Sequence, residues 1–350
     1  MKQTLLAATL IICMAGVSTA QDNRAAFKNI SMLQQSDPSA AFKAALSLAE
    51  KRYPPAIDRV GYYFRHGIGT DRNLEAARDW YARAVAAEHP WSTASLARVE
   101  IELNRGDVAL QLLEAAVLED LPGTLRLLAT SHIDGDFGVA SDPQSGRKML
   151  ESLSVRGDQN AARELVVRIN WHRLSAPASD IAIAQVVQAG LAGEVRFAET
   201  ALVYLARHGK KNEETLGTRF ALANIPGVRD RVLSPELIRL AADAHPAQFW
   251  SKSEEILEQT ETENYATTAS VAFWINKNAW VRVLQKELRL LGYYKGRING
   301  RMTSSTIKAQ NRFCRDENLW HICANGPLRG ATVRALAGAI AAHKRPKITL

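Results

Sequence analysis

The sequence predicts an all-α protein, in which a helical-repeat solenoid (an α/α superhelix) is followed by a small three-helix domain. Two observations predict the solenoid: apolar residues recur at steps of three and four through residues 21–250, and a helix–turn–helix unit returns after about 30 to 40 residues. Alternation typical of strands is hard to find. The chain has 350 residues, 47% of them hydrophobic and 23% charged, a composition that fits two or three globular domains and excludes a disordered or collagen-like chain.

The first 20 residues have the pattern of a secretory signal peptide. Lys2 precedes an apolar stretch from Leu5 to Val17, and small residues lead to Ala20, after which we expect cleavage. The alternative is a membrane anchor, but the apolar run is short and no stop-transfer flank follows it. We therefore expect a periplasmic protein with no transmembrane segment in the mature chain.

This placement changes the interpretation of the cysteines. Once Cys13 is removed with the signal peptide, Cys314 and Cys323 remain, and a pair in an oxidising compartment is predicted to form a disulfide. The alternative is a catalytic thiol, which His321 alone does not support because one neighbouring histidine does not make a dyad.

Residues 56–84 give the most informative unit of the repeat region. A helix with small and aromatic residues on one face is predicted to end at a turn containing Gly67 and Gly69, where left-handed backbone is available. Asp71 or Asn73 is then placed to cap a second helix. The remaining pattern residues are Ala56, Gly61, Tyr62, Ala76, Ala77, Trp80, Tyr81 and Ala84, of which we expect Tyr62, Trp80 and Tyr81 to pack inside the repeats.

This unit resembles a Sel-one-like repeat, a relative of the tetratricopeptide repeat. A weaker copy spans about 127–150, and a compact helix pair lies between them at 92–118. The resemblance implies that 21–250 is an interaction scaffold, whose partner would be an unidentified periplasmic or membrane protein. His132, Asp134 and Asp136 suggest a metal site at first, but they fall at an expected inter-helix turn, where such residues serve as caps. We therefore expect no metal.

The composition changes after residue 250. Residues 251–276 are rich in Ser, Thr and Glu and are expected to be a linker at a domain boundary, although much of this segment could also continue a helix. From Lys277 onward the net charge is +12, which exceeds the +8 of the whole chain, and residues 341–350 form a basic tail. An anionic partner is therefore expected at this end. Nucleic acid is not expected, since a secreted protein seldom meets it.

Residues 277–340 resemble a small three-helix peptidoglycan-binding domain. The pattern consists of Gln285 and Leu288 in a first helix, the run Leu291-Gly292-Tyr293, the turn Asn299-Gly300 and a second helix with Thr306, Ala309 and Phe313. A second turn and helix follow from Asn325. The resemblance implies cell-wall contacts by Tyr293, Tyr294, Arg297 and Arg301. The alternative is that the tyrosines pack the core and the arginines form a solvated face.

Patterns of catalysis are weak in this sequence. Ser145–Lys148 and Ser305–Lys308 fit the Ser-x-x-Lys spacing of penicillin-interacting enzymes, but the companion motifs are missing. We therefore expect no catalytic residues and no cofactor. The predicted function is a non-catalytic periplasmic adaptor that holds a protein partner and rests on peptidoglycan. The alternatives are a regulator of a membrane sensor kinase or of an exopolysaccharide system and, less favoured, a cell-wall hydrolase or penicillin-interacting enzyme.

Overall fold

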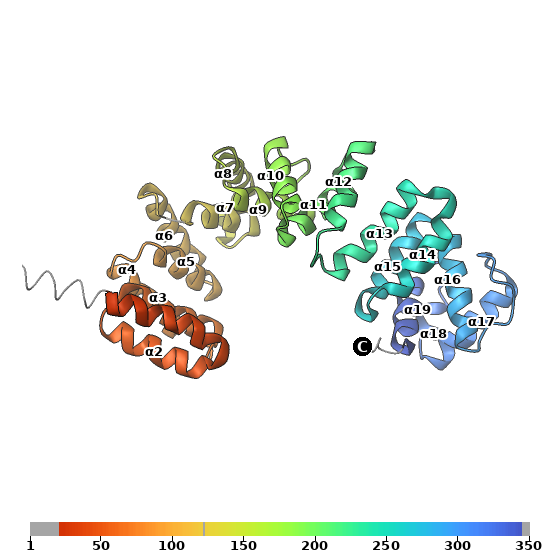
Figure 1. Cartoon of the computed structure of the whole chain (residues 1–350), viewed down its shortest axis with the longest axis horizontal. Helices are drawn as coiled ribbons and strands as arrows, with labels where there is room; N and C mark the ends of the chain where they lie inside the picture. The colour runs from red at the N-terminus through yellow and green to blue at the C-terminus, as the bar shows by residue number, and fades with distance from the viewer. Residues whose placement is uncertain (1–20, 122, 345–350) are drawn as a thin grey trace, which may run out of the picture. The chain divides into compact units, whose positions relative to one another are not determined.

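The computed structural model describes residues 21–121 and 123–344, and within them the regular structure is entirely helical (Figure 1). The expected signal peptide, residues 1–20, lies outside the described residues. The chain divides into two compact units between Arg156 and Gly157. The all-α, helical-repeat prediction is therefore confirmed for the described part of the chain.

The first unit is a series of short helices in which each helix packs against the next along the chain. Its buried faces consist mainly of alanine, leucine and aromatic side chains. Helical residues 21–36 come first. They are followed by α2 (Pro38–Glu50), α3 (Pro54–His66), α4 (Leu74–Ala86), α5 (Ser92–Glu102), α6 (Gly106–Leu118), α7 (Thr124–Asp134), the 3-10 turn η1 (Gly138–Ala140) and α8 (Pro143–Val155).

The predicted repeat unit is the pair α3 and α4. Gly67 ends α3 with φ 66° and ψ 39°, the left-handed conformation that glycine adopts at low cost. Of the two candidate caps, Asn73 begins α4: its side-chain oxygen accepts a hydrogen bond from the backbone N–H of Ala76 at 3.0 Å. The sequence thus located both the turn and the start of the second helix.

Packing within this pair depends on Gly61 and Tyr81. The Tyr81 ring is 1% exposed and lies so close to Gly61 that a Cβ there would sit 3.0 Å from two ring carbons. Trp80 and Tyr62 are partly buried and pack against the core of this unit, which agrees with the expected packing role. The guanidinium of Arg83 lies over the Trp80 ring, 4.6 Å from its centroid, so this tryptophan has one face near solvent.

The second unit continues the succession of packed helices and ends in a compact core. Its first helices are α9 (Gln159–Asn170), α10 (Asp180–Leu191), α11 (Val195–His208), α12 (Glu213–Ala223) and α13 (Asp230–Ala244). Its last elements are η2 (Pro246–Gln248), α14 (Phe249–Gln259), α15 (Thr262–Ile275), α16 (Lys277–Leu290), α17 (Ser304–Asp316), α18 (Trp320–Cys323) and α19 (Gly330–His343).

The expected linker at 251–276 is wrong, because helices α14 and α15 of this segment are packed into the core formed by the helices that follow. Tyr265 and Phe273 of α15 are fully buried in the same core as Trp280 of α16 and Phe313 of α17, and α15 packs along α19. The glutamates that suggested a linker lie mostly on the outer faces, whereas Tyr265 and Phe273 enter the core.

The expected basic tail is also folded where the structure describes it. Residues 341–343 belong to α19, and residues 345–350 lie outside the described residues. The Lys344 ammonium lies 3.2 Å from an oxygen of Glu287 and 3.9 Å from the centroid of the Tyr265 ring. Lys344 therefore ties the end of α19 to α15 and α16.

A pair of glycine substitutions tests the packing of α3 on α4. Gly61→Ala should lower the free energy of unfolding by about 1–3 kcal/mol, because the added methyl meets the Tyr81 ring. Gly217→Ala is the matched control: Gly217 also lies inside a helix, but nothing is within 4 Å of an added Cβ, so the change should be neutral or stabilise by up to about 1 kcal/mol. Urea denaturation measures both. Equal effects of the two substitutions would contradict the packing.

Candidate functional site

Gln285 builds the loop that carries the predicted cell-wall contacts. Its side chain is fully buried, and its Oε1 accepts hydrogen bonds from the backbone N–H groups of Asn299 and Gly300 at 2.9 and 3.0 Å. Its Nε2 donates to the carbonyl oxygen of Arg301 and to Thr306 Oγ1, both at 2.9 Å. One amide therefore fixes the loop between α16 and α17, which explains the glutamine of the sequence pattern.

The four predicted contact residues do not share one environment. Tyr294 is 4% exposed, and its hydroxyl donates to the carbonyl oxygen of Arg297 inside the loop, so its ring belongs to the core. Tyr293 is partly exposed, packs edge-on against Phe313, and donates its hydroxyl proton to Asp316 at 2.8 Å. Arg297 and Arg301 are exposed. The available surface is thus Tyr293 with the two arginines.

Part of the positive charge of this region is neutralised by the segment expected to be a linker. Arg282 of α16 pairs with Glu254 of α14, and Lys286 pairs with Glu258. These pairs join α14 to α16, two helices that pack together. The net charge of +12 counted from Lys277 therefore overstates the field at this surface, because α14 supplies nearby carboxylates.

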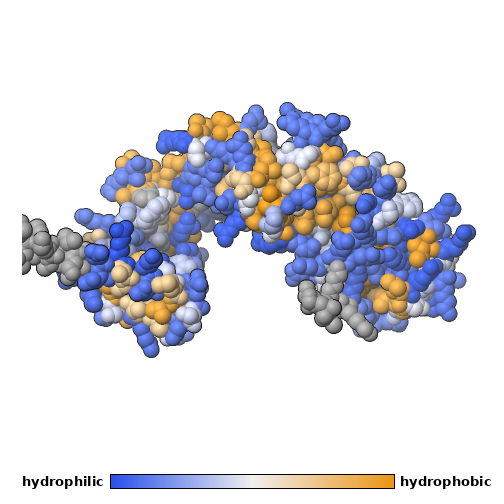
Figure 2. Space-filling model, viewed as in Figure 1, coloured by the Kyte–Doolittle hydropathy of each residue, from blue (hydrophilic) through white to orange (hydrophobic). Residues whose placement is uncertain are grey.

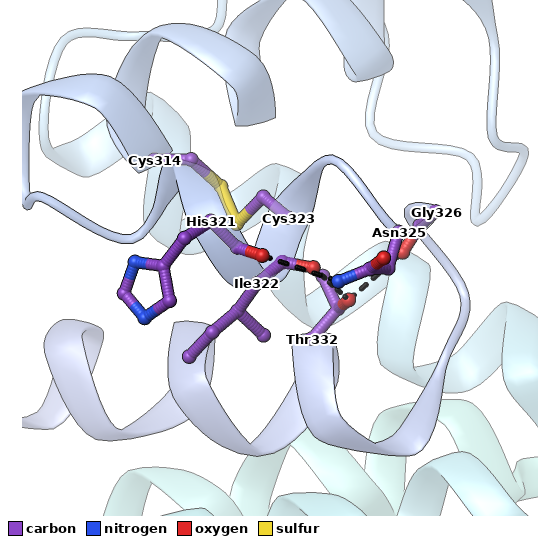
Figure 3. Close-up of a disulfide and its surroundings, with 7 residues drawn as sticks. All are labelled: Cys314, His321, Ile322, Cys323, Asn325, Gly326 and Thr332. Atoms are coloured by element: carbon purple, nitrogen blue, oxygen red, sulfur yellow. Dashed lines mark hydrogen bonds between the residues drawn. A yellow bond between two sulfur atoms is a disulfide. The ribbon is translucent and has the colours of Figure 1, made fainter.

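The structure joins Cys314 of α17 to Cys323 of α18 in a disulfide (Figure 3). Both cysteines are buried, and the exposed His321 ring points away from the sulfur atoms. The same turn is closed by Thr332, whose hydroxyl donates to the carbonyl oxygen of Gly326 at 2.9 Å. The bridge therefore holds α18 and the loop after it, and these contacts give the sulfur atoms a structural role.

Ser92, His89 and Asp58 form a cluster that resembles a hydrolase triad in composition only. The Ser92 hydroxyl donates to Asp58 Oδ1 at 2.7 Å, and His89 Nδ1 lies 2.9 Å from the same hydroxyl oxygen. In a Ser-His-Asp triad the serine proton goes to histidine, and the aspartate holds the other ring nitrogen. Here the aspartate accepts that proton and Ser92 is fully buried, so the cluster ties α3 to the start of α5.

His132 is used for packing. Its ring is 9% exposed and stands edge-on to Phe137, and its Nδ1 accepts a hydrogen bond from the backbone N–H of Asp142 at 3.1 Å. Burial lowers the pKa of this imidazole, which keeps it neutral. Across residues 21–121 and 123–344, no three His, Cys, Asp or Glu side chains gather closely enough to hold a metal ion. Nor does any helix in this part of the chain have the length and apolar content to cross a membrane.

A groove of about 720 Å³ opens between α11, α12, α13 and α15, and sequence inspection did not find it. We name it the α11–α15 groove. Figure 2 shows hydrophobic residues gathered over the part of the second unit where Figure 1 places α10 to α13. The apolar wall of the groove includes Val271, Trp274 and Ile275, and the side chains of Trp274 and Ile275 are 70% and 42% exposed.

The cationic residues that line the α11–α15 groove come from α11, α12, α13 and the loop between α11 and α12, and we call this part of the lining the basic wall. Its cationic residues are Arg207, Lys210, Lys211, Arg219 and Arg239, and the carboxylates among the lining residues are Glu213 and Asp243. The run of basic residues around Lys210 can be recognised in the sequence. The contribution of the apolar residues of α15 to the same groove cannot, because only the folded chain brings α15 against α13.

Arg219 and Arg239 of the basic wall belong to an ion network with Glu236 and Asp243. Arg219 Nε donates to Glu236 Oε1 at 2.6 Å, and its Nη1 donates to Asp243 at 2.7 Å. Arg239 lies 3.5 Å from the other oxygen of Glu236. Glu236 is 1% exposed, and burial raises the pKa of its carboxyl although two arginines oppose this. Arg219 Nη2 is buried without a hydrogen-bond partner, so the network holds an unused donor.

Comparisons with known proteins give similarity over limited lengths or at low identity. No protein-family model matches the chain. In sequence, the chain is similar to the chitin synthase regulator SKT5 of Saccharomyces cerevisiae, with 41% identity over 54 residues, which are 15% of this chain and 8% of the yeast protein. This chain therefore spans less than a tenth of the length of that relative.

Two solved structures are similar in shape. One is c5321, a protective antigen present in uropathogenic Escherichia coli strains and displaying an SLR fold, with a TM-score of 0.43 and 14% identity over 90% of this chain and 75% of that one. The other is a Sel1 repeat protein from Oxalobacter formigenes, with a TM-score of 0.46 and 15% identity over 67% of this chain and 98% of that one. The repeat architecture stated above rests on the helices and their packing in this protein.

Reduction tests the contribution of the disulfide. Breaking the bond between Cys314 and Cys323 frees a loop of about ten residues, which should cost roughly 2–3 kcal/mol of unfolding free energy in the chain-entropy model. Thermal melts with and without dithiothreitol measure this, and a Cys314→Ala/Cys323→Ala variant serves as control, since the reductant should not shift its melting temperature. The prediction would be contradicted if dithiothreitol left the melting temperature of the wild type unchanged.

Arg219→Met tests the buried ion network. The substitution leaves the Glu236 carboxylate buried with only Arg239 nearby, so unfolding free energy should fall by about 3–5 kcal/mol at neutral pH. Adding Glu236→Gln should recover part of this loss by removing the charge. Burial raises the folded-state pKa of Glu236 and Arg219 opposes that rise, so the pKa should be higher still in the variant, and the deficit should shrink as pH falls from the variant's pKa to that of the wild type. A deficit that is independent of pH in urea denaturation would show that charge burial is not its cause.

Proposed function

We propose that this protein is a non-catalytic scaffold of Sel-one-like repeats that binds a protein partner. The observation that carries this proposal is the succession of short helix pairs, each packed on its neighbours, with the Gly67 turn and the Asn73 cap at the positions of the repeat pattern. Such arrays present extended surfaces on which several repeats can contact one partner.

We further propose that the scaffold works in the periplasm and associates with the cell wall through residues 277–340. The N-terminal pattern from Lys2 to Ala20 supports export, and the disulfide is of the kind that persists in an oxidising compartment. The wall contact would use Tyr293, Arg297 and Arg301, which remain accessible on the loop that Gln285 holds. Tyr294 is left out of this set because it is buried.

A regulatory role is the second candidate. The similarity to a protein named as a chitin synthase regulator favours it, since the partner would then be the periplasmic part of a membrane protein that controls polysaccharide synthesis or export. Binding to purified sacculi separates the two: the adaptor binds the wall by itself, whereas the regulator needs only its protein partner.

Sedimentation with purified sacculi tests the wall contact. The mature chain should pellet with sacculi, and binding should weaken as salt rises, because attraction between exposed charges is screened over about 8–10 Å at physiological salt. Arg297→Glu/Arg301→Glu should reduce the pelleted fraction several-fold. Lys210→Glu/Lys211→Glu is the matched control, with the same change in net charge at other exposed positions, and should leave pelleting unchanged. Equal losses in the two variants would show that only bulk charge matters, and the wall assignment would then be wrong.

A further inference from the structure

We propose that the α11–α15 groove binds an acidic segment of the protein partner, with its carboxylates on the basic wall and a neighbouring apolar side chain on Trp274. This inference rests on the proposed scaffold function and names the chemistry that its partner presents. It follows from the groove's two unlike walls, from cations that the protein leaves unpaired, and from an exposed tryptophan that is already held in place.

The basic wall has charge to offer a ligand. Lys210 and Lys211 are exposed, and neither ammonium takes part in an ion pair with any described residue. Arg219 is buried and already pairs with Glu236 and Asp243, so the cations accessible to a ligand are the two lysines. Burial and the nearby charge of Arg207 both lower the pKa of Arg239, although Glu236 opposes this. The protein's own carboxylates therefore neutralise only part of the positive charge that lines the groove.

The carboxylates that face this wall belong to three residues. Glu236 already forms ion pairs with Arg219 and Arg239. Asp243 is half-exposed and already accepts from Arg219, and Glu213 stands in the first turn of α12. None of these carboxylates pairs with Lys210 or Lys211, so an incoming carboxylate would find two ammonium groups at the rim without displacing an internal ion pair.

The apolar wall is rigid enough to receive a side chain. The Trp274 ring lies over Gly330, where a Cβ would stand only 3.0 Å from its Cζ2 atom, and it packs edge-on against the buried Phe273 ring. One part of this ring is thereby fixed while 70% of the residue stays exposed. A preformed aromatic surface loses little conformational entropy when a ligand covers it.

These two walls together select the class of occupant. A polyanion such as a nucleic acid or polyphosphate would satisfy the lysines but leave Val271, Trp274 and Ile275 without an apolar contact. A purely apolar helix face would bury the lysine ammonium groups without partners, which is costly. A chain segment with acidic residues flanking a leucine or phenylalanine matches both walls, and about 720 Å³ is room for a few side chains.

Fluorescence anisotropy of three labelled hexapeptides tests the groove on the mature full-length chain. The first peptide, Glu-Asp-Leu-Phe-Asp-Glu, should bind. The second, Gln-Asn-Leu-Phe-Asn-Gln, has nearly the same shape without side-chain charge. It should bind about tenfold more weakly, because it loses the attraction between its carboxylates and the lysines. The third replaces Leu and Phe by Ser and should also bind more weakly. Equal affinities for the first two peptides, or no binding of the first at millimolar concentration, would overturn the proposal.

Variants then locate the binding. Lys210→Glu/Lys211→Glu should weaken binding of the acidic peptide by about tenfold or more, and Trp274→Ala by about fivefold. Lys43→Glu/Lys51→Glu carries the same change in net charge at exposed positions outside both proposed sites and should bind the peptide like the wild type. Circular dichroism melts confirm that each variant is folded. Displacement of the peptide by inorganic polyphosphate at equal charge concentration, together with no effect of Trp274→Ala, would show a simple anion site and overturn the peptide assignment.

A crosslinking experiment tests the scaffold proposal separately from the groove assignment. Periplasmic crosslinking should capture partner proteins with the wild-type chain, and capture should fall in the Lys210→Glu/Lys211→Glu variant. Capture that is unchanged in this variant would overturn the groove assignment and leave the scaffold standing. Absence of any captured protein would instead count against the scaffold itself.

Discussion

Neighbouring helices of this protein approach each other at backbone distance, and the rest of the architecture depends on that approach. A Cβ on Gly146 of α8 would lie 2.3 Å from the carbonyl oxygen of Ala129 in α7, and one on Gly190 of α10 would lie 2.9 Å from the backbone nitrogen of Ala198 in α11. Only glycine fits such contacts, and the alanine-rich faces around them are buried completely. Short helices that are marginal alone are thereby stabilised by their neighbours, which is how repeat arrays obtain their stability.

Close packing of short helices also explains where polar groups gather. The ends of helices and the turns between them lie at the edges of the array, so caps, ion pairs and exposed cations concentrate there. The α11–α15 groove is such a place, since Lys210 and Lys211 lie in the loop that follows the end of α11. The buried pair of Arg219 with Glu236 then costs desolvation energy that surface pairs do not.

The C-terminal core follows a different plan from the repeats. There a single buried amide, Gln285, organises a loop, a disulfide fixes a one-turn helix, and α15 packs along α19 from a distant part of the chain. The surface of this module is less positive than the net charge from Lys277 onward indicates, because α14 contributes Glu254 and Glu258 to it. Both the candidate wall contact and the apolar side of the groove depend on this module, since Trp274 belongs to α15.

The sequence by itself determined the features that local chemistry controls. The helical class, the turn at Gly67 and the cap at Asn73 could be predicted, because a three- and four-residue periodicity, a left-handed glycine and a capping side chain act within a few residues. Pairing of the only two cysteines beyond Cys13 was equally accessible. Only the tertiary structure decided that 251–276 packs into a core, that Tyr294 is buried, and that Trp274 lines the same groove as Lys210 and Lys211. These outcomes depend on which distant helices pack together, and one chain's pattern of apolar residues does not specify that.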